Sequence, residues 1–211
     1  MYLRKLKTKN IYIVRHGETD FNKRGIVQGS GIDAPLNDKG RRQAQAFFEN
    51  YNDVVFEKIY TSKLIRTQQS VQAFIDKPTP HQKLEGLNEI NWGEKEGQVV
   101  TTEDNKYYWQ ILKEWQKGNT SLKIAGGESP EDVQSRQKDA LKTILNGDES
   151  DILICMHGRA LRVFMCLMLN KPLKDMDDFA HSNLCLYKLL YNEDEFLLQE
   201  SNKIDHLAGL L

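Results

Sequence analysis

The sequence predicts a three-layer α/β/α fold built on a mostly parallel central sheet with one antiparallel edge region. Ile11–Val14 and Asp151–Met156 are dominated by apolar residues, which predicts two buried central strands. Segments with helical periodicity alternate with the predicted strands, and this order is typical of parallel sheets covered on both faces. Near the end of the chain, Leu184–Leu190 and Phe196–Ser201 predict two closing strands.

The first half of the chain contains the signals for two helices and a short strand. Asn37 is expected to cap a helix that runs through Tyr51. Lys58–Thr61 predicts a strand, and Ser62 is expected to cap a helix over Lys63–Ile75. The first of these helices places its apolar side chains at helical spacing, at Ala44, Phe47, Phe48 and Tyr51.

The second half of the chain predicts three more helices. Asp104–Lys117 carries one apolar stripe. Ser129 and Pro130 form a strong helix start, because serine caps the first turn and proline suits the first helical position, and Gly147 is expected to end this helix. Ala160–Leu169 is apolar on nearly all sides, so we expect a buried helix there. The apolar stripe of Asp104–Lys117 consists of Tyr108, Ile111, Leu112 and Trp115.

Length and charge limit the classes of protein to which the chain can belong. Its 211 residues suit one domain, residues 1–211, with room for a small insertion. Lysine and arginine number 29 and aspartate and glutamate 30, so the overall charge does not indicate a nucleic-acid partner. The basic N-terminus precedes an apolar run too short for a signal peptide, and no stretch approaches the length of a membrane span. We therefore expect a cytoplasmic protein without a nucleic-acid or membrane partner, and the sequence predicts no oligomeric state.

The three cysteines, Cys155, Cys166 and Cys185, lie in apolar stretches, and no two have the spacing of metal ligands. We expect them to be small buried hydrophobic residues rather than a disulfide framework. The sequence thus indicates neither a metal site nor a bound cofactor.

Arg15 and His16 come directly after the first buried strand, at the edge where open parallel sheets bind ligands. The sheet holds a histidine rigidly at such a position, and a neutral imidazole is a competent nucleophile toward phosphorus. The guanidinium of Arg15 matches phosphate oxygens, and nearby arginines disfavour protonation of His16. An arginine–histidine pair alone is equally compatible with a solvent-facing loop.

His157 and Gly158 come after the second buried strand and repeat this arrangement. The helix after them is expected to present free N–H groups and the positive end of its dipole, which favour a bound anion. In that setting His157 would donate a hydrogen bond to a phosphoryl oxygen in the transition state. One such histidine could serve only as a cap, but two strand-end His-Gly pairs argue against two unrelated histidines.

Arg15-His16-Gly17-Glu18-Thr19, with Asn22 shortly after it, resembles the signature of the histidine phosphatase superfamily, also called phosphoglycerate-mutase-like. The resemblance extends over nearly the whole chain. It implies the phosphoglycerate-mutase-like fold and a metal-independent enzyme that acts on a small phosphorylated metabolite without a cofactor. Further segments match in the family's order: Gln28-Gly29, Asp33-Ala34-Pro35-Leu36, Thr61–Thr67, Leu87-Asn88-Glu89, Gly126–Ser129, His157-Gly158 and Asn183.

The resemblance also implies roles for the matching residues. Arg66 would clamp the phosphoryl oxygens together with Arg15. Glu89 would protonate the leaving-group oxygen and then deprotonate the attacking water, with Glu94 and Glu96 as nearby rivals for this role.

Asn22, Gln28 and Gly158 are expected to bind the phosphoryl group or the substrate, although asparagine and glutamine are also ordinary turn residues. Arg159 departs from the family pattern, in which a small residue is common after the second His-Gly pair. Its side chain would either add a cation at the rim of the pocket or face solvent.

Residues 96–123 form the expected lid-like insertion. Within it, Tyr108 and Trp115 are expected to pack on the domain, whereas Tyr107 and Trp109 project elsewhere and can reach a substrate. The segment is short compared with the lid of bisphosphoglycerate-dependent mutases, which must exclude water. A short lid favours a phosphatase that hydrolyses small phosphomonoesters through a phosphohistidine on His16, and a phosphoglycerate mutase is the nearest alternative.

Two further alternatives stay open. A metal-dependent hydrolase that uses His16 and His157 is disfavoured by the adjoining arginines, because cations repel a metal ion. A non-catalytic module that binds phosphorylated ligands is disfavoured by the combination of both histidines with Arg15, Arg66 and Glu89.

Overall fold

A six-stranded sheet with the order β3-β2-β4-β1-β5-β6 forms the centre of the computed structural model, which describes residues 8–99 and 106–210. β1 pairs in parallel with β4, β4 with β2, and β2 with β3, whereas β5 is antiparallel to both β1 and β6. This arrangement confirms the predicted mostly parallel sheet with an antiparallel edge. The strands are β1 (Lys9–Arg15), β2 (Lys58–Thr61), β3 (His81–Lys83), β4 (Asp151–Met156), β5 (Leu186–Asn192) and β6 (Glu195–Lys203).

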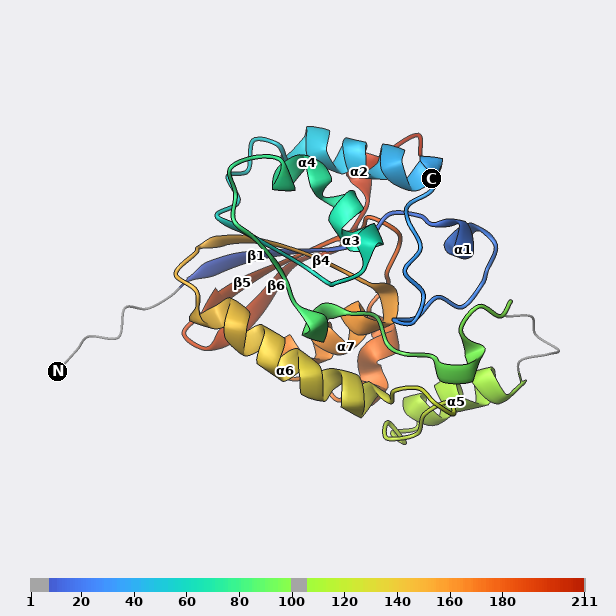
Figure 1. The fold of residues 1–211 in the computed structure, drawn as a ribbon. Helices are drawn as coiled ribbons and strands as arrows, with labels where there is room; N and C mark the ends of the chain where they lie inside the picture. Colours follow the sequence, from blue (N-terminus) through green and yellow to red (C-terminus); the bar gives the residue numbers. More distant parts are fainter. Residues whose placement is uncertain (1–7, 100–105, 211) are drawn as a thin grey trace.

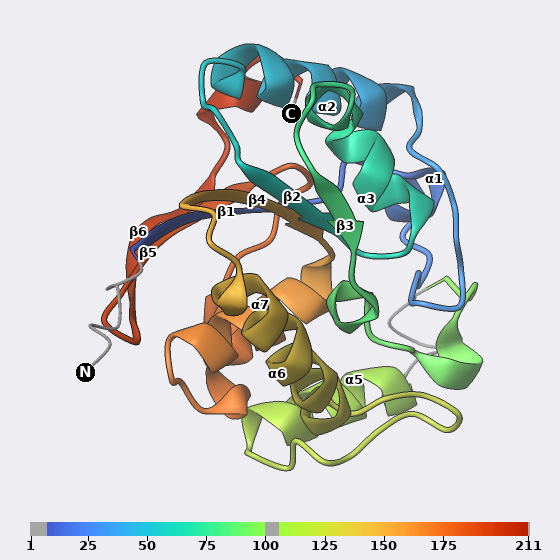
Figure 2. The same ribbon diagram turned by 60° about the vertical axis from the view of Figure 1, so that its left-hand side comes forward.

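Helices cover both faces of the sheet (Figures 1 and 2). One layer contains α2 (Asp38–Tyr51), α3 (Ile65–Ser70) and α4 (Gln72–Ile75), and the other contains α6 (Pro130–Asn146) and α7 (Gly158–Met168). The short helix α1 (Asp20–Lys23) comes after β1, and α5 (Lys106–Gln116) lies beside the α6–α7 layer. The 3₁₀ turns are η1 (Glu85–Leu87), η2 (Gly93–Lys95), η3 (Leu173–Asp178) and η4 (Asp205–Leu207).

Local capping signals place the two longest helices as the sequence predicts. The Asn37 side chain accepts from the Gly40 N–H at the start of α2. Ser129 forms a capping box with Asp132, Pro130 occupies the first turn of α6, and Gly147 is the C-cap. These hydrogen bonds lie within a few residues of each other, so the sequence alone is sufficient to predict them.

Ser62 does not cap a helix, which corrects the prediction for Lys63–Ile75. The first helix of this segment starts at Ile65 after Leu64, and it ends at Val71, whose dihedral angles of φ −125° and ψ 20° are not helical. The hydroxyl of Ser62 instead accepts from the Leu64 N–H and contacts Thr67 and His157. A contact with a side chain from another strand end therefore replaces the expected local cap.

Other boundaries differ by a few residues. The helix expected at Ala160 begins at Gly158, because His157 already occupies the N-cap position. The helix expected from Asp104 is described from Lys106, since residues 100–105 lie outside the described part of the chain. β3 was not predicted, because His81–Lys83 is polar and lacks the apolar pattern of a central strand.

The core consists of two apolar clusters, one on each face of the sheet. Phe47, Phe74 and Val14 belong to one cluster, and Phe164 and Val133 to the other. Cys155, Cys166 and Cys185 are buried free thiols, as predicted. No helix within residues 8–99 or 106–210 combines the length and the apolar character that crossing a bilayer requires.

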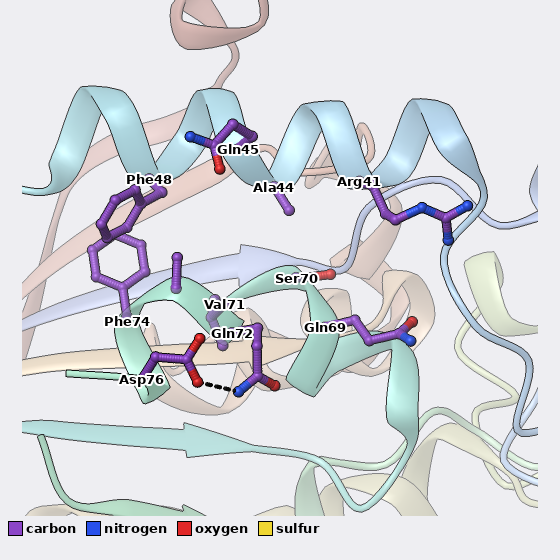
Figure 3. Close-up of a pocket in the computed structure, with 11 residues that line it drawn as sticks. Arg41, Ala44, Gln45, Phe48, Gln69, Ser70, Val71, Gln72, Phe74 and Asp76 are labelled. Atoms are coloured by element: carbon purple, nitrogen blue, oxygen red, sulfur yellow. Dashed lines mark hydrogen bonds between the residues drawn. The ribbon is translucent and has the colours of Figure 1, made fainter. Parts of the chain in front are cut away.

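A hollow of about 260 Å³ lies between α2 and the α3–α4 segment, and Figure 3 shows the side chains that line it. Phe48 and Phe74 pack edge to face there with ring centroids 5.0 Å apart, and Gln72 donates to Asp76. None of the residues that line this hollow belongs to the predicted catalytic set. The predicted site residues lie instead at the strand ends.

Candidate active site

A cleft of about 510 Å³ opens where β1 and β4 end. Six predicted site residues line it together: Arg15, His16, Asn22, Gln28, Glu89 and Gly158. Arg66 and His157 are fully buried behind this surface, and the rings of His16 and His157 lie 5.1 Å apart. The fold thus brings all eight residues of the predicted site into one region.

His16 is fixed by hydrogen bonds on its backbone and on one ring nitrogen. Its N–H donates to the Met156 carbonyl, and its own carbonyl accepts from Nδ2 of Asn183. Nδ1 of the ring lies 2.7 Å from the Gly17 carbonyl oxygen. Because a carbonyl oxygen only accepts, Nδ1 carries the proton and Nε2 of the neutral ring has a free lone pair. Nε2 has no hydrogen-bond partner among the described residues.

The surroundings of His16 keep its ring neutral. Burial lowers its pKa well below the ordinary value of 6.5, and the charges of Arg66 and Arg15 lower it further. The neutral form is the nucleophilic form of imidazole. Gly17 is required next to it, because a Cβ there would lie 2.7 Å from the Gly40 carbonyl oxygen.

His157 has the opposite tautomer. Nε of Arg66 donates to Nδ1 of His157 at 3.2 Å, so this nitrogen is an acceptor and the proton lies on Nε2. Nε2 lies 2.8 Å from the hydroxyl oxygen of Ser62. Burial and the charge of Arg66 lower the pKa of His157 well below 6.5, so this ring is also neutral.

Arg66 uses its guanidinium to connect three segments. Besides His157, it donates to the carbonyls of Ile32 at 2.7 Å and Gly29 at 3.2 Å. Burial lowers its pKa to about 10, so it remains a cation at neutral pH. The geometry makes Arg66 an internal positive charge that orients His157, rather than a residue on the surface of the cleft.

Arg15 has the free donor that the cleft needs for an anion. Nη1 donates to the His181 carbonyl at 2.6 Å, whereas Nε is buried and has no partner among the described residues. A buried N–H without an acceptor costs free energy, which a bound anion would recover. Gly158 lies beside this atom, and a Cβ on it would come within 2.7 Å of the His181 ring and 3.4 Å of Arg15 Nε.

Glu89 lies at the N-terminus of α7. Its carboxylate oxygens accept from the backbone N–H groups of Ile90, Arg159 and Ala160 at 2.9, 3.1 and 2.8 Å. The sequence analysis expected the N–H groups at the start of this helix to bind an anion. Two of them, on Arg159 and Ala160, donate to Glu89 instead. This contact orients the carboxyl group at the edge of the cleft.

Glu94 and Glu96 are the two other candidates for the general acid. Glu96 accepts from the backbone N–H groups of Gly31 and Trp92, which joins two loops. Neither Glu94 nor Glu96 lines the cleft. Of these three glutamates, Glu89 is the one that lines the cleft in the part of the chain that the structure describes.

Hydrogen bonds link Thr19 to both Asn22 and Gln28. The Thr19 hydroxyl donates to Oε1 of Gln28, and Oδ1 of Asn22 accepts from the Thr19 N–H and from Nδ2 of Asn183. Nε2 of Gln28 is buried and has no partner among the described residues. Gln28 therefore offers a second free donor to an anion in the cleft.

Residues 11–204 match the family model of the histidine phosphatase superfamily, branch 1. The chain belongs to this superfamily.

Relatives with full-length similarity have phosphatase and mutase names. The chain is 24% identical to a Hydrogenobacter thermophilus protein provisionally named phosphoserine phosphatase 2, over 96% of this chain and 99% of that protein. It is 27% identical to a Salmonella choleraesuis protein provisionally named phosphoglycerate mutase GpmB, over 93% and 94% of the two chains. Among solved structures, the α-ribazole phosphatase of Shigella flexneri superposes with a TM-score of 0.81 at 24% identity, covering 92% of this chain and 96% of that chain. This last similarity shows the shared fold.

Sequence reasoning missed His181. His181 lines the cleft, packs against Gly158, and provides the carbonyl that binds Arg15. Burial and three arginines, Arg15, Arg162 and Arg159, lower its pKa to about 2. The segment around it shows neither strand nor helix periodicity, so no local signal marks it as a site residue.

The aromatic residues of α5 divide differently from the prediction. Trp115 is buried and stacks on Trp92 at 5.7 Å, as expected of a packing residue. Tyr108 also packs on Trp92, but it lines the cleft as well, together with the half-exposed Trp109. Tyr107 does not line the cleft, and its hydroxyl donates to the Lys123 carbonyl.

No group of three or more histidine, cysteine, aspartate or glutamate residues with the geometry of a metal site occurs within residues 8–99 and 106–210. The polar groups of the cleft consist mainly of donors and cations. Such a set suits an anionic ligand.

Proposed function

We propose that this protein is a phosphatase that hydrolyses small phosphomonoesters through a phosphohistidine formed on His16. The observation that carries the proposal is the state of the His16 ring. Its Nδ1–H donates to the Gly17 carbonyl, the ring is neutral, and its Nε2 lone pair has no partner in the described chain. A rigid, neutral imidazole at the edge of a donor-rich cleft has the properties of a nucleophile toward phosphorus.

Donors around the cleft would stabilise the charge that develops on the phosphoryl oxygens. Arg15 Nε and Gln28 Nε2 are buried and free to bind oxygen. Arg66 adds a positive charge and orients His157, whose ring lies 5.1 Å from that of His16. Donors that are already in place cost little reorganisation when the reaction occurs.

Glu89 would move the proton in both steps. In the first, His16 Nε2 forms a bond to phosphorus, the ester P–O bond breaks, and Glu89 gives its proton to the leaving oxygen. In the second, water attacks the phosphohistidine, Glu89 takes the proton from that water, and phosphate leaves with the P–N bond broken. The hydrogen bonds to the backbone of α7 fix the position of the carboxylate for both transfers.

We propose that residues 96–123 act as a lid, of which α5 is the described helix. Trp109 and Tyr108 face the cleft from this helix. The three buried free thiols are compatible with a reducing compartment, and we include a cytoplasmic location in the proposal.

Rapid quenching tests the proposal directly. Mixing the protein with a ³²P-labelled phosphomonoester and quenching within milliseconds should trap a label that is acid-labile, base-stable and located on His16. Release of labelled phosphate should proceed at the rate of turnover. Turnover without a label, or with a label on another residue, would overturn the proposal.

The role of Glu89 is tested by substitution and choice of leaving group. Glu89→Gln should slow hydrolysis of alkyl phosphates by about 100-fold or more, because their alkoxide leaves only with a proton. The aryl ester para-nitrophenyl phosphate needs no proton for its first step and should lose less. Equal losses on both substrates would exclude Glu89 as the acid.

A phosphoglycerate mutase is the second candidate, favoured by the similarity to a protein provisionally named phosphoglycerate mutase GpmB. The two functions differ in the fate of the phosphoryl group. A mutase interconverts 2- and 3-phosphoglycerate with little phosphate release, whereas a phosphatase releases phosphate without isomerisation. Assaying both products in one reaction decides between them.

A further inference from the structure

A second cavity of about 440 Å³ adjoins the cleft. The two share four lining residues, so they form one continuous space that extends away from His16: Tyr108, Trp109, Arg159 and His181. A substrate whose phosphoryl group lies at His16 would direct its leaving group along this space.

Positive charge dominates the second cavity. Arg159, Arg162 and Lys113 line it, and Asp177 is its single carboxylate among the described residues. Oδ1 of Asp177 accepts from Nη1 of both arginines at 2.6 Å, so one negative charge is shared by two guanidiniums. The lining residues therefore retain an excess of positive charge.

The two guanidiniums are held in place by the fold. Nε of Arg162 donates to the Phe179 carbonyl at 2.8 Å. The guanidinium of Arg159 lies 5.5 Å from the ring of Trp115 and 6.0 Å from that of Trp92. Their side chains are only 8% and 16% exposed for Arg159 and Arg162, so these cations are largely desolvated. Desolvated cations that share one carboxylate are stabilised by a second anion.

His181 lies between the phosphate end and the second cavity. His181 lines both cavities, whereas Arg15 lines the first and Arg162 the second. Burial and the charges of Arg15, Arg162 and Arg159 lower the pKa of the His181 ring. The ring remains neutral at physiological pH, since its pKa is about 2. The path from Arg15 to Arg162 therefore has cations at both ends and a neutral, polar ring between them.

We propose that the second cavity binds an anionic group, a carboxylate or a phosphate, on the leaving-group side of the substrate. The preferred substrates are then small phosphomonoesters that carry a second negative charge. The rings of Tyr108 and Trp109 cover the carbon skeleton between the two anionic groups. This inference rests on the proposed phosphatase function and adds the substrate class to it.

Matched substrate pairs test the inference. 3-Phosphoglycerate and glycerol 3-phosphate differ only by a carboxylate in place of a hydroxymethyl group. Ethylene glycol bisphosphate and 2-hydroxyethyl phosphate make the same comparison for a second phosphate. We expect kcat/KM to be at least about tenfold higher for the member with the second anionic group in one or both pairs, mainly through a lower KM. The pair with the larger ratio identifies carboxylate or phosphate as the bound group.

Substitutions then assign the preference to this cavity. Arg162→Gln and Lys113→Glu should each reduce the ratio within the preferred pair by about fivefold or more, with kcat for the substrate that lacks the second anionic group retained. Lys113 is exposed, so the second variant remains informative if Arg162→Gln does not fold. Lys142→Glu makes the same charge change on α6, away from both cavities, and should leave the ratio unaltered.

Two results would overturn the inference: equal kcat/KM within both pairs, or a preference that persists unchanged in both variants. Hydrolysis of para-nitrophenyl phosphate with a label on His16 serves as the reference in each case. If that reaction occurs and the pairs do not differ, the inference fails while the proposed function stands.

Discussion

At the end of β1 the chain passes through His16 and Gly17 into a loop, whereas at the end of β4 it passes through His157 directly into α7. In the loop, the Gly17 carbonyl is free to accept from Nδ1 of the neighbouring ring. At the helix start, the His157 carbonyl accepts from the Leu161 N–H, and the ring contacts Arg66 and Ser62 instead. The same dipeptide at two strand ends therefore produces opposite tautomers.

The difference separates two chemical roles. His16 has a lone pair on Nε2 with no partner among the described residues, so it can attack phosphorus. Both ring nitrogens of His157 have protein partners, so this ring is held as a polar group beside the phosphoryl site. The conformation of the chain after each histidine, a loop in one case and a helix in the other, determines which ring has a nitrogen lone pair without a partner among the described residues.

Removing the nucleophile should have the largest effect. His16→Ala is expected to lower kcat by at least about 10⁴-fold and to abolish the phosphoryl label, because no other group replaces the attacking nitrogen. Steady-state kinetics and rapid quenching measure both. Retention of more than about a hundredth of the activity would break the distinction between the two histidines.

His157→Ala should lower kcat less than His16→Ala and should not prevent the phosphoryl label from forming. It removes a stabilising polar group but leaves the nucleophile, so kcat should fall about 100- to 1,000-fold while a label still forms on His16. The same quench experiment measures this. Loss of both label and turnover to the level of His16→Ala would remove the distinction between the two histidines.

Acid should destabilise the protein because both histidines are buried and neutral. Their pKa values in the folded state are well below 6.5, so below pH 6.5 the unfolded chain binds protons that the folded chain does not. Folding stability is therefore retained above pH 6.5 and declines as the pH falls below it. Between pH 7 and 5.5 the two rings together should lower the free energy of unfolding by about 2–3 kcal/mol. Urea unfolding at both pH values measures the change.

A variant at each position separates the contributions to this decline. His16→Asn or His157→Asn should each remove about 1 kcal/mol of the acid-dependent loss, since one titrating ring is then absent, while His181, whose pKa is about 2, continues to contribute. A loss that stays the same in both variants would place the titrating groups elsewhere.

Ser62→Ala should have the smallest effect. Without the serine oxygen, Nε2–H of His157 loses its acceptor, and kcat is expected to fall about 3- to 10-fold. ¹⁵N NMR of the histidine rings should show the Nε2–H tautomer of His157 less populated, whereas His16 stays unchanged. Thr67→Ser retains the hydroxyl that contacts Ser62 and is the matched control. An unaltered tautomer in Ser62→Ala would show that Arg66 alone fixes the ring.

Sequence reasoning succeeded where short-range patterns decide the structure. The strands of the parallel sheet that carry apolar runs, the helix starts at Asn37 and Ser129, and the residues His16 and Arg15 at a strand end all depend on neighbours in the chain. Ser62 shows the limit, because its local pattern predicts a cap and a distant imidazole recruits the hydroxyl instead.

By itself the sequence determined the fold class, the two strand ends and the residue types that meet there, since hydrophobic periodicity and capping act over a few residues. Only the tertiary structure decided the tautomers, the burial of Arg66, the contact of Glu89 with the start of α7 and the position of His181 in both cavities. Arg66 and His157 are 91 residues apart and Glu89 and Ala160 are 71 apart in the chain. Hydrogen bonds and charge interactions over such separations exist only after the strands pair and α7 packs, and they keep the rings of His16 and His157 neutral.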